Sequence, residues 1–431
     1  MVMKNLRQNL LTIFYRCFMF TIVLSFTFLL PAQTIVTIEE CQQWAVTQSS
    51  ANVQKELNTQ LLKVKLDDAA SHFHPSLEIH GLISYQSDVS QLPLTFENVD
   101  KISRDQYRVG LELYQVLFDG GKVVFNRRYE HLANNTEINK LDLMINKLKE
   151  QVIALYLNLL IIDKQSAILT NVEKTISDQL DQLKIMLKEG VIYGNALVLL
   201  EVEQLKIQQQ KGELQATKGS IISSLSILTG KDLSNAEFII PNVVDEEANT
   251  ESFRLEYNIF KNEISGLDYK RKLHYANTIP QISLIGLGGY GRTTLNVFSN
   301  DFNWFYYVGI HFRVPVINWT KTTGVGNIIN LQKSILQAQQ SDFEKENKIA
   351  IQEKLNEILR IEELLHLDKQ ITEKYREITT TYSIQLSNGS ITVYDYIKQQ
   401  NDEIQSLINQ ELHAFQLLKA KYELKALKGK L

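Results

Sequence analysis

Cysteine and proline are scarce in this chain of 431 residues, which holds two cysteines and six prolines. Cys17 lies in an apolar N-terminal stretch, and Cys41 follows it. So few thiols exclude a disulfide framework and a metal cluster built from cysteines. Proline falls below its usual share of about 5%. Because proline interrupts regular structure, we expect long uninterrupted elements.

An excess of positive charge is also lacking, since 49 acidic residues against 45 basic ones give a net charge of −4. This balance gives no electrostatic reason to expect nucleic-acid binding. The sequence has no P-loop, nucleophile elbow or zincin motif. The segment Gly286–Gly291 fits G-x-G-x-x-G, but no helix follows it as a dinucleotide site requires. We therefore expect neither an enzyme nor a cofactor, and no metal site, although His72, His74 and His80 lie close together.

The N-terminus has the order of a secretory signal peptide. Lys4, Arg7 and Arg16 precede an apolar run over residues 17–30, and Pro31 and Ala32 follow it. The run is shorter than the ~20 residues that a membrane-spanning helix needs. We expect residues 1–32 to be removed on export.

Long apolar runs are absent after this leader. The longest strongly apolar run, Val152–Ile162, is short and contains Asn158. We therefore expect no transmembrane helix in the mature chain. If the exported chain crosses a membrane, it must do so as a β-barrel, because only helices and closed barrels satisfy every backbone group in lipid.

Two long stretches of the sequence contain neither glycine nor proline. They lie between Gly121 and Gly190 and between Gly326 and Gly389. A helix over either stretch would be on the order of 90–100 Å long. A glycine and a second helical segment follow each of them, so we expect antiparallel coiled-coil hairpins. The expected long helices cover 122–189 and 327–388, and the return helices cover 195–228 and 394–428.

Heptad spacing supports the first long helix. Apolar residues recur there every three or four positions, as in a coiled coil. The predicted seam comprises Leu141, Ile145, Leu148, Val152, Leu155, Leu159, Ile162, Leu169, Ile176, Leu180, Leu183 and Leu187. The second long helix has two shorter seams, namely Ile351, Leu355 and Ile358, and then Ile371, Tyr375, Ile378 and Tyr382.

Four segments between the helices are expected to be β-strands. Three of them show the alternation of a strand, and the fourth, near Gln281–Tyr290, is rich in glycine and alternates poorly. Leu77 and Ile79 alternate with Glu78 and His80 in the first of them. Lengths of about 10 residues with one apolar face are typical of transmembrane β-strands, although a soluble sheet is the alternative. The aromatic run 304–307 resembles an interfacial girdle. The strands are expected over 76–86, 106–118, 281–291 and 304–316, joined by polar loops over 86–105 and 292–303.

The number of strands predicts an assembly. Four strands cannot close a membrane barrel, since the smallest have about eight. An open sheet edge cannot lie in lipid. Several chains must therefore contribute to one barrel, and three chains would supply twelve strands.

The order helix, strand, strand, long helix, return helix occurs twice, which indicates a duplication. The first repeat covers 33–240, and the second covers 241–431 with its first helix at 250–276. Equivalent positions recur in order. They are Pro75 with Pro280, Asp119 with Asn318, and Gly190 with Gly389.

Over residues 34–431 the sequence resembles the TolC family of outer-membrane efflux proteins of Gram-negative bacteria. The segments that carry the resemblance, besides the two strand-opening prolines, are Thr37–Cys41, Leu117–Lys122 and Tyr382–Tyr396. The second half departs from the family, with Asn318-Trp319-Thr320 where Asp-Gly-Gly is common.

The resemblance implies a mixed α and β fold that assembles as a homotrimer. Three chains would form a twelve-stranded β-barrel in the outer membrane and an α-helical barrel in the periplasm. Such a channel is a passive duct in a tripartite export system. Its implied partners are outer-membrane lipid, a periplasmic adaptor protein and an inner-membrane pump of the RND or ABC type.

The resemblance also implies roles for particular residues. The pore entrance would contain Asp395, with Lys398 in place of a second acid. The adaptor-docking tip would comprise Gly190, Val191, Gly389, Ser390 and Thr392. The junctions between strands and helices would be formed by Pro75, Asp119, Gly120, Gly121, Pro280 and Asn318.

Two alternatives remain at this stage. An exported coiled-coil scaffold would explain the helices without conduction, although it leaves the aromatic strands unexplained. Within the family, type I secretion of a polypeptide is the alternative to efflux of small molecules.

Overall fold

The structure is a computed structural model that describes residues 35–90, 102–190, 192–242, 253–316 and 319–430. The predicted signal peptide and the predicted site residues Val191 and Asn318 lie outside the described residues.

Helical segments and strands alternate along the chain. The N-terminal half contains β1 (Ile35–Val36), α2 (Ile38–Gln48), α3 (Ser50–Ser71), β2 (Ser76–Tyr85), β3 (Asp105–Phe118), α4 (Lys122–Lys188), α5 (Gly194–Thr229) and β4 (Glu237–Phe238). The C-terminal half contains α6 (Leu255–Tyr275), the 3₁₀ turn η1 (Ala276–Thr278), β5 (Gln281–Arg292), β6 (Asn303–Arg313), α7 (Trp319–Ser387) and α8 (Val393–Leu427).

The chain divides into two compact units that cut across the two predicted repeats. One, here called the hairpin unit, comprises Met1–Gln48, Gln151–Val244 and Ile361–Lys419. The other, called the sheet unit, comprises Ser49–Glu150, Asp245–Arg360 and Ala420–Leu431. Each unit takes elements from both halves of the sequence, because α4, α7 and α8 contribute to both. The duplication stays a prediction.

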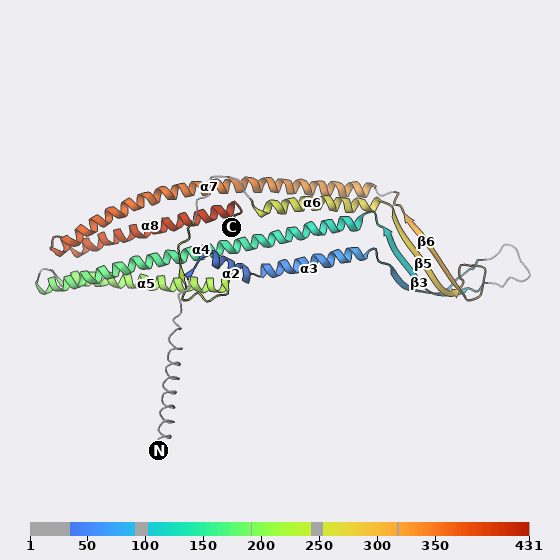
Figure 1. Cartoon of the computed structure of the whole chain (residues 1–431), viewed down its shortest axis with the longest axis horizontal. Helices are drawn as coiled ribbons and strands as arrows, with labels where there is room; N and C mark the ends of the chain where they lie inside the picture. Colours follow the sequence, from blue (N-terminus) through green and yellow to red (C-terminus); the bar gives the residue numbers. More distant parts are fainter. Residues whose placement is uncertain (1–34, 91–101, 191, 243–252, 317–318, 431) are drawn as a thin grey trace, which may run out of the picture. The chain divides into compact units, whose positions relative to one another are not determined.

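A four-stranded antiparallel sheet lies in the sheet unit, in the order β2-β3-β5-β6. Figure 1 shows β3, β5 and β6 running side by side. The register places Leu77 opposite Leu113, Leu113 opposite Gly286, and Gly286 opposite Val308. Because side chains alternate along a strand, these four positions share one face of the sheet.

The hairpin unit is built on helices that run back along one another. Figure 1 shows α5 beside α4 and α8 beside α7. Lys211 Nζ on α5 lies 2.6 Å from Glu173 Oε2 on α4, and Lys218 on α5 pairs with Asp163 on α4 about two to three turns along the helices. The residue numbers rise on one helix as they fall on the other, so α4 and α5 are antiparallel.

The predicted seam of α4 lies mainly in the interior. Nine of its members are buried, namely Leu141, Ile145, Val152, Leu159, Ile162, Leu169, Ile176, Leu180 and Leu183. In the hairpin unit, the last four share a core with Leu200, Leu386 and Tyr396 from α5, α7 and α8. The two seams of α7 differ, because Ile351 and Ile358 of the first are buried, whereas Ile371 and Ile378 of the second are exposed in the single chain.

Two element boundaries differ from the sequence expectation. Glycine disfavours a helix by about 1 kcal/mol relative to alanine, which is why the sequence predicts a start at residue 327. Yet α7 begins at Trp319 and includes the buried Gly326, where a Cβ would lie 3.5 Å from the Tyr275 hydroxyl oxygen. At the other boundary, β6 ends at Arg313 rather than at 316, since Pro315 has no N–H for the ladder.

Among the described residues, one helix, α4, is long and apolar enough over part of its length to cross a membrane by those criteria alone. The relevant stretch is 44% buried within the structure. Partial burial of this kind is also a property of core helices in water-soluble regions, and it matches the seam of α4.

Tyr156 fastens the ends of two chain segments to α4. Its hydroxyl lies 2.8 Å from the carbonyl oxygens of Val36 and Ile239 and accepts a hydrogen bond from the Ile239 N–H at 3.0 Å. Val36 and Phe238 pair in the short parallel ladder of β1 and β4. The side chain of Tyr156 is fully buried, and its hydrogen bond to the Val36 carbonyl is buried with it.

We expect Tyr156→Phe to lower the free energy of unfolding by about 2 kcal/mol, because it removes the hydroxyl that bonds Val36 and Ile239 and the Val36 site is buried. Urea denaturation followed by circular dichroism measures the change. Tyr193→Phe is the matched control, since Tyr193 is 86% exposed and should lose almost nothing. Equal stability of the two variants would contradict this account of Tyr156.

Candidate functional site

One face of the sheet is apolar and uncovered. Ile79 is 80% exposed, Ile83 is 81% exposed and Trp304 is 82% exposed. A contiguous patch of this size is unusual on a water-soluble monomer and marks a surface that contacts something apolar. Its largest exposed members are Leu77, Ile79, Ile83, Tyr85, Tyr107, Val109, Leu111, Trp304, Tyr306, Val308, Ile310 and Phe312.

The opposite face is the more polar one, although it also carries Leu82 and Tyr307. Glu78 lies opposite Glu112 in the register of β2 and β3, and His80 and Arg108 share that face. Two carboxylates directly across a ladder repel each other. Such a pair is tolerated where water solvates both groups, and both side chains are exposed. The sheet therefore has one face suited to an apolar medium and one suited to water.

The outer edges of β2 and β6 are unpaired in the described part of the chain. An unpaired edge presents free N–H and C=O groups that can pair with another strand. Because β2, β3, β5 and β6 alternate in direction, β2 and β6 run in opposite directions. If β6 of one copy paired with β2 of the next, the antiparallel alternation would continue.

The junction after β3 is fixed by Asp119. Its carboxylate accepts hydrogen bonds from the N–H groups of Gly121 at 2.8 Å and Val123 at 2.7 Å, as an N-cap of α4 does. Gly120 has φ = 76°, and a Cβ there would lie 2.8 Å from the Ala276 carbonyl oxygen. The Asp-Gly-Gly sequence is thus explained by the turn geometry.

The two predicted prolines stand directly before strands. Pro75 precedes β2 and Pro280 precedes β5. Proline has no N–H to donate, so it is tolerated at the first position of a strand or just before it.

Gly389 ends α7 in a Schellman motif. It has φ = 68°, its N–H donates to the Leu386 carbonyl at 2.9 Å, and the Ser390 N–H donates to the Gln385 carbonyl at 2.9 Å. Gly190 ends α4 with φ = 75°, and its N–H donates to the Leu187 carbonyl at 3.1 Å. Positive φ at both positions explains why glycine occupies each turn.

Asp395 and Thr392 form a capping box at the start of α8. Thr392 Oγ1 donates to Asp395 Oδ2 at 2.6 Å, and the Asp395 N–H donates to Thr392 Oγ1 at 3.2 Å. Both side chains are exposed. Lys398 is also exposed, and among the described residues no ion pair joins it to Asp395. The structure therefore gives Asp395 a local structural role that the sequence analysis did not consider.

A buried polar contact joins α4 and α7 in the hairpin unit. The buried Gln179 on α4 donates from Nε2 to Ser383 Oγ on α7 at 2.9 Å. Tyr396 is buried in the same apolar cluster, and burial raises the pKa of its hydroxyl to about 12, with Glu403 adding to the rise. Tyr396 therefore stays neutral at every physiological pH.

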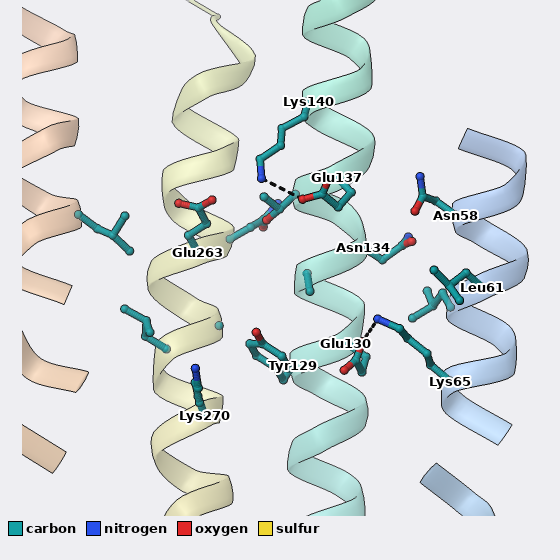
Figure 2. A pocket seen from close by; sticks show the side chains of 17 residues that line it. Asn58, Leu61, Lys65, Tyr129, Glu130, Asn134, Glu137, Lys140, Glu263 and Lys270 are labelled. Atoms are coloured by element: carbon teal, nitrogen blue, oxygen red, sulfur yellow. Dashed lines mark hydrogen bonds and ion pairs between the residues drawn. The ribbon is translucent and has the colours of Figure 1, made fainter. Parts of the chain in front are cut away.

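The sheet unit contains a cavity of about 430 Å³ lined by α3, α4, α6 and one residue of α7. Figure 2 shows its charged lining. Lys65 Nζ lies 2.9 Å from Glu130 Oε2, and Lys140 Nζ lies 2.9 Å from Glu137 Oε1. The hydrogen bond to Glu137 raises the pKa of Lys140, burial opposes the rise, and the nearby charge of Glu263 adds to it.

The cavity has the volume of a small-molecule site. Its lining carries charges of both signs, which the sequence analysis did not single out. Among the described residues no group of three His, Cys, Asp or Glu side chains is placed to hold a metal ion. Periodicity alone did not reveal this cavity, because its lining comes from four helices far apart in the sequence.

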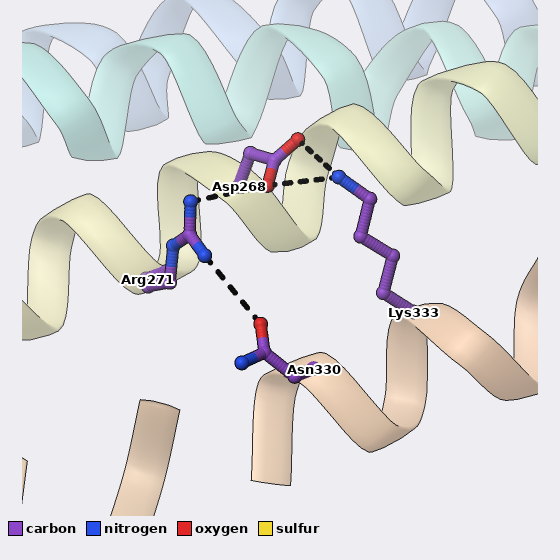
Figure 3. Close-up of polar contacts among 4 residues, drawn as sticks. All are labelled: Asp268, Arg271, Asn330 and Lys333. Atoms are coloured by element: carbon purple, nitrogen blue, oxygen red, sulfur yellow. Dashed lines mark hydrogen bonds and ion pairs between the residues drawn. The ribbon is translucent and has the colours of Figure 1, made fainter. Parts of the chain in front are cut away.

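Polar contacts join α6 to α7 in the same unit (Figure 3). Lys333 Nζ on α7 lies 2.9 Å from Asp268 Oδ2 on α6. On α6, Arg271 Nη2 lies 3.8 Å from Asp268 Oδ1, and Arg271 donates from Nη1 to Asn330 Oδ1 at 3.4 Å. These side chains are about one-third exposed, so the pairs contribute to alignment more than to stability.

A second charged group lies where α7 and α8 meet in the sheet unit. Burial works against the charge of Lys354, but hydrogen bonds to Glu357 and Glu423 outweigh it and raise the pKa of Lys354. Glu150 on α4 has a raised pKa, chiefly because burial disfavours its charged form, and Arg254 opposes that rise. Lys354 therefore stays charged, while Glu150 is protonated more readily than an exposed glutamate.

No protein-family model and no curated protein matches the sequence. Solved structures do match the fold. The Campylobacter jejuni CmeC outer-membrane channel is similar with a TM-score of 0.68 at 14% identity, over 91% of this chain and 86% of that one. The outer-membrane channel OprN has a TM-score of 0.71 at 11% identity, over 91% of this chain and 90% of that one.

A third structure, the Neisseria gonorrhoeae MtrE outer-membrane channel in its open state, has a TM-score of 0.65 at 13% identity. The match covers 91% of this chain and 89% of that one. The chain therefore has the fold of the outer-membrane channels, which confirms at the level of the fold its predicted resemblance to the TolC family.

Proposed function

We propose that this chain is the outer-membrane channel of a tripartite export system. The observation that carries the proposal is the uncovered apolar face of the sheet, backed by a polar face. A lipid-facing and a water-facing side are what a membrane β-barrel requires. In this function the apolar face contacts outer-membrane lipid, and the long helices extend into the periplasm of a Gram-negative cell.

The channel is a homotrimer in this proposal. One copy contributes four strands with two open edges, and an open edge is not tolerated in lipid. Three copies give twelve strands, joined between β6 of one copy and β2 of the next. Apolar side chains on the helices also lack cover in one copy, for example Val53, Leu57 and Val64 on α3. A neighbouring copy would bury such stripes.

The duct is passive, and its partners supply the energy. The turns at Gly190 and Gly389 form the adaptor-docking tip, together with Val191, Ser390 and Thr392. An inner-membrane pump of the RND or ABC type completes the system. The similar structures are channels by name, which fits a role without catalysis. Neither a cofactor nor nucleic acid is part of this function.

Three copies per particle are expected when the full chain, produced with its leader, is extracted from the outer-membrane fraction in mild detergent. Native mass spectrometry of the extracted protein counts the copies. A soluble periplasmic monomer would overturn the proposal and leave the scaffold alternative.

A charge on the apolar face should block insertion of the barrel. We expect Ile79→Lys to lower the stability of the barrel in the membrane by about 2–4 kcal/mol per copy. The reason is that Ile79 lies near the middle of β2 on the apolar face. His80→Lys is the matched control, because His80 is the next residue and lies on the polar face. Semi-native electrophoresis of membrane fractions measures the folded trimer, which should fall for Ile79→Lys alone. Equal loss in both variants would contradict the assignment of the faces.

Asp395 is proposed to form a ring of three carboxylates at the pore entrance, which favours cations. Asp395→Asn removes the charge but keeps an oxygen for the cap. We expect it to lower the cation-to-anion permeability ratio by roughly twofold, because the field of three charges is lost. The reversal potential across a planar bilayer in a salt gradient measures this ratio.

Thr392→Ala is the control for Asp395, since it breaks the same capping box and keeps the charge. It should leave selectivity unchanged. If Thr392→Ala lowers selectivity as much as Asp395→Asn does, the effect comes from the cap, and the ring assignment fails.

A further inference from the structure

The loop that joins β5 to β6, residues 293–302, presents more apolar surface than the polar loop that the sequence predicts. It exposes Leu295, Val297, Phe298 and Phe302, with exposed fractions between 44% and 59%. A connecting loop that faces water usually presents polar side chains at such positions. Four large apolar side chains within ten residues form a patch that needs an apolar neighbour.

Phe302 joins this loop to the apolar face of the sheet. Its ring centroid lies 5.9 Å from that of Tyr290 and 6.2 Å from that of Tyr107. Tyr290 in turn lies 5.2 Å from Trp304. The register places Tyr107, Tyr290 and Trp304 on the apolar face. The apolar surface is therefore continuous from the strands into the loop.

A paired cation lies at the base of the loop. Arg292, the last residue of β5, forms an ion pair with Asp105, the first residue of β3. Its Cζ lies 5.2 Å from the ring centroid of Phe302 and 5.8 Å from that of Tyr107. A guanidinium beside two aromatic rings and neutralised by a carboxylate is compatible with the partly dehydrated zone between headgroups and hydrocarbon.

The loop also satisfies part of its own backbone. The Phe298 N–H donates to Asn296 Oδ1 at 3.2 Å, and the Ser299 N–H donates to the Asn296 carbonyl at 3.2 Å. Across to the other loop of the sheet, the Ser103 N–H donates to Asn300 Oδ1 at 2.9 Å. Such internal bonds reduce the need for water where polar groups approach lipid.

We propose that the β5–β6 loop lies in the interfacial layer of the outer leaflet, with Leu295, Val297 and Phe298 against the upper part of the acyl chains. The loop would extend the aromatic girdle of Tyr290, Trp304 and Tyr306 beyond the strands. The occupant of the patch is then lipid, not a neighbouring copy or a soluble protein. The inference rests on the proposed function, because it requires the sheet to lie in a membrane.

Quenching of single tryptophans by lipid tests the proposal. The full-length protein has three tryptophans, Trp44, Trp304 and Trp319. With all three replaced by phenylalanine, Phe298→Trp reports on the loop and Asp88→Trp reports on the polar loop after β2. The proteins are reconstituted in phosphatidylcholine vesicles in which one acyl chain is brominated close to the headgroup.

We expect bromolipid to quench Phe298→Trp about threefold more than Asp88→Trp, because tryptophan at the interface contacts the upper acyl chain. Aqueous iodide should show the reverse order. Leu295→Trp provides a second reporter if Phe298→Trp does not assemble as the parent protein does. Quenching of the loop reporters at the level of Asp88→Trp would overturn the lipid assignment.

A variant that keeps Trp304 alone separates this inference from the proposed function. If Trp304 is quenched by bromolipid while the loop reporters are not, the barrel stands and the loop proposal fails. If Trp304 is not quenched either, the sheet does not lie in the bilayer, and both fail.

Discussion

A sheet of four strands with an uncovered apolar face and two unpaired edges is the constraint on which the rest depends. Exposing such a face to water is unfavourable by roughly 25 cal/mol for each Å² of apolar surface, because that surface is not buried. Its edges would also pair with any available strand. Neither problem is solved within the described part of one chain, where Ile83 and Tyr306 stay exposed and no strand covers β2 or β6. In the proposed function, lipid covers this face and strands of other copies pair with the two edges.

The packing of the helices follows from the heptad spacing of their apolar residues. The seam of α4 packs against α5, α7 and α8 in the hairpin unit, and buried residues such as Ile176 and Leu183 form its centre. Heptad spacing is enough to select partners of this kind, because it keeps one apolar stripe along each helix. Buried polar contacts, such as that of Gln179 with Ser383, then restrict how the helices align. Apolar positions left outside this core mark the surface that remains for other molecules.

Capping residues stabilise the helix ends at the junctions with strands and turns. Asp119 caps α4, and Thr392 with Asp395 caps α8, while Gly389 closes α7 through positive φ. These groups satisfy backbone N–H and C=O groups that a helix end leaves free. The same residues carry much of the family resemblance, so part of that resemblance reflects local backbone geometry. For Asp395, this local role exists beside any role in conduction.

The sequence by itself determined the strands, the long helices and the turns between them, because alternation, heptad spacing and glycine position act over short distances along the chain. It also predicted the two unlike faces of the sheet, since Ile79 and His80 must point in opposite directions. Only the tertiary structure decided which elements meet. It placed Gly326 inside α7 beside Tyr275, tied β1 and β4 to Tyr156, and gathered four helices around the cavity near Glu137. It also turned Phe302 onto Tyr107, more than a hundred residues away, because such contacts depend on three-dimensional packing that no local pattern records.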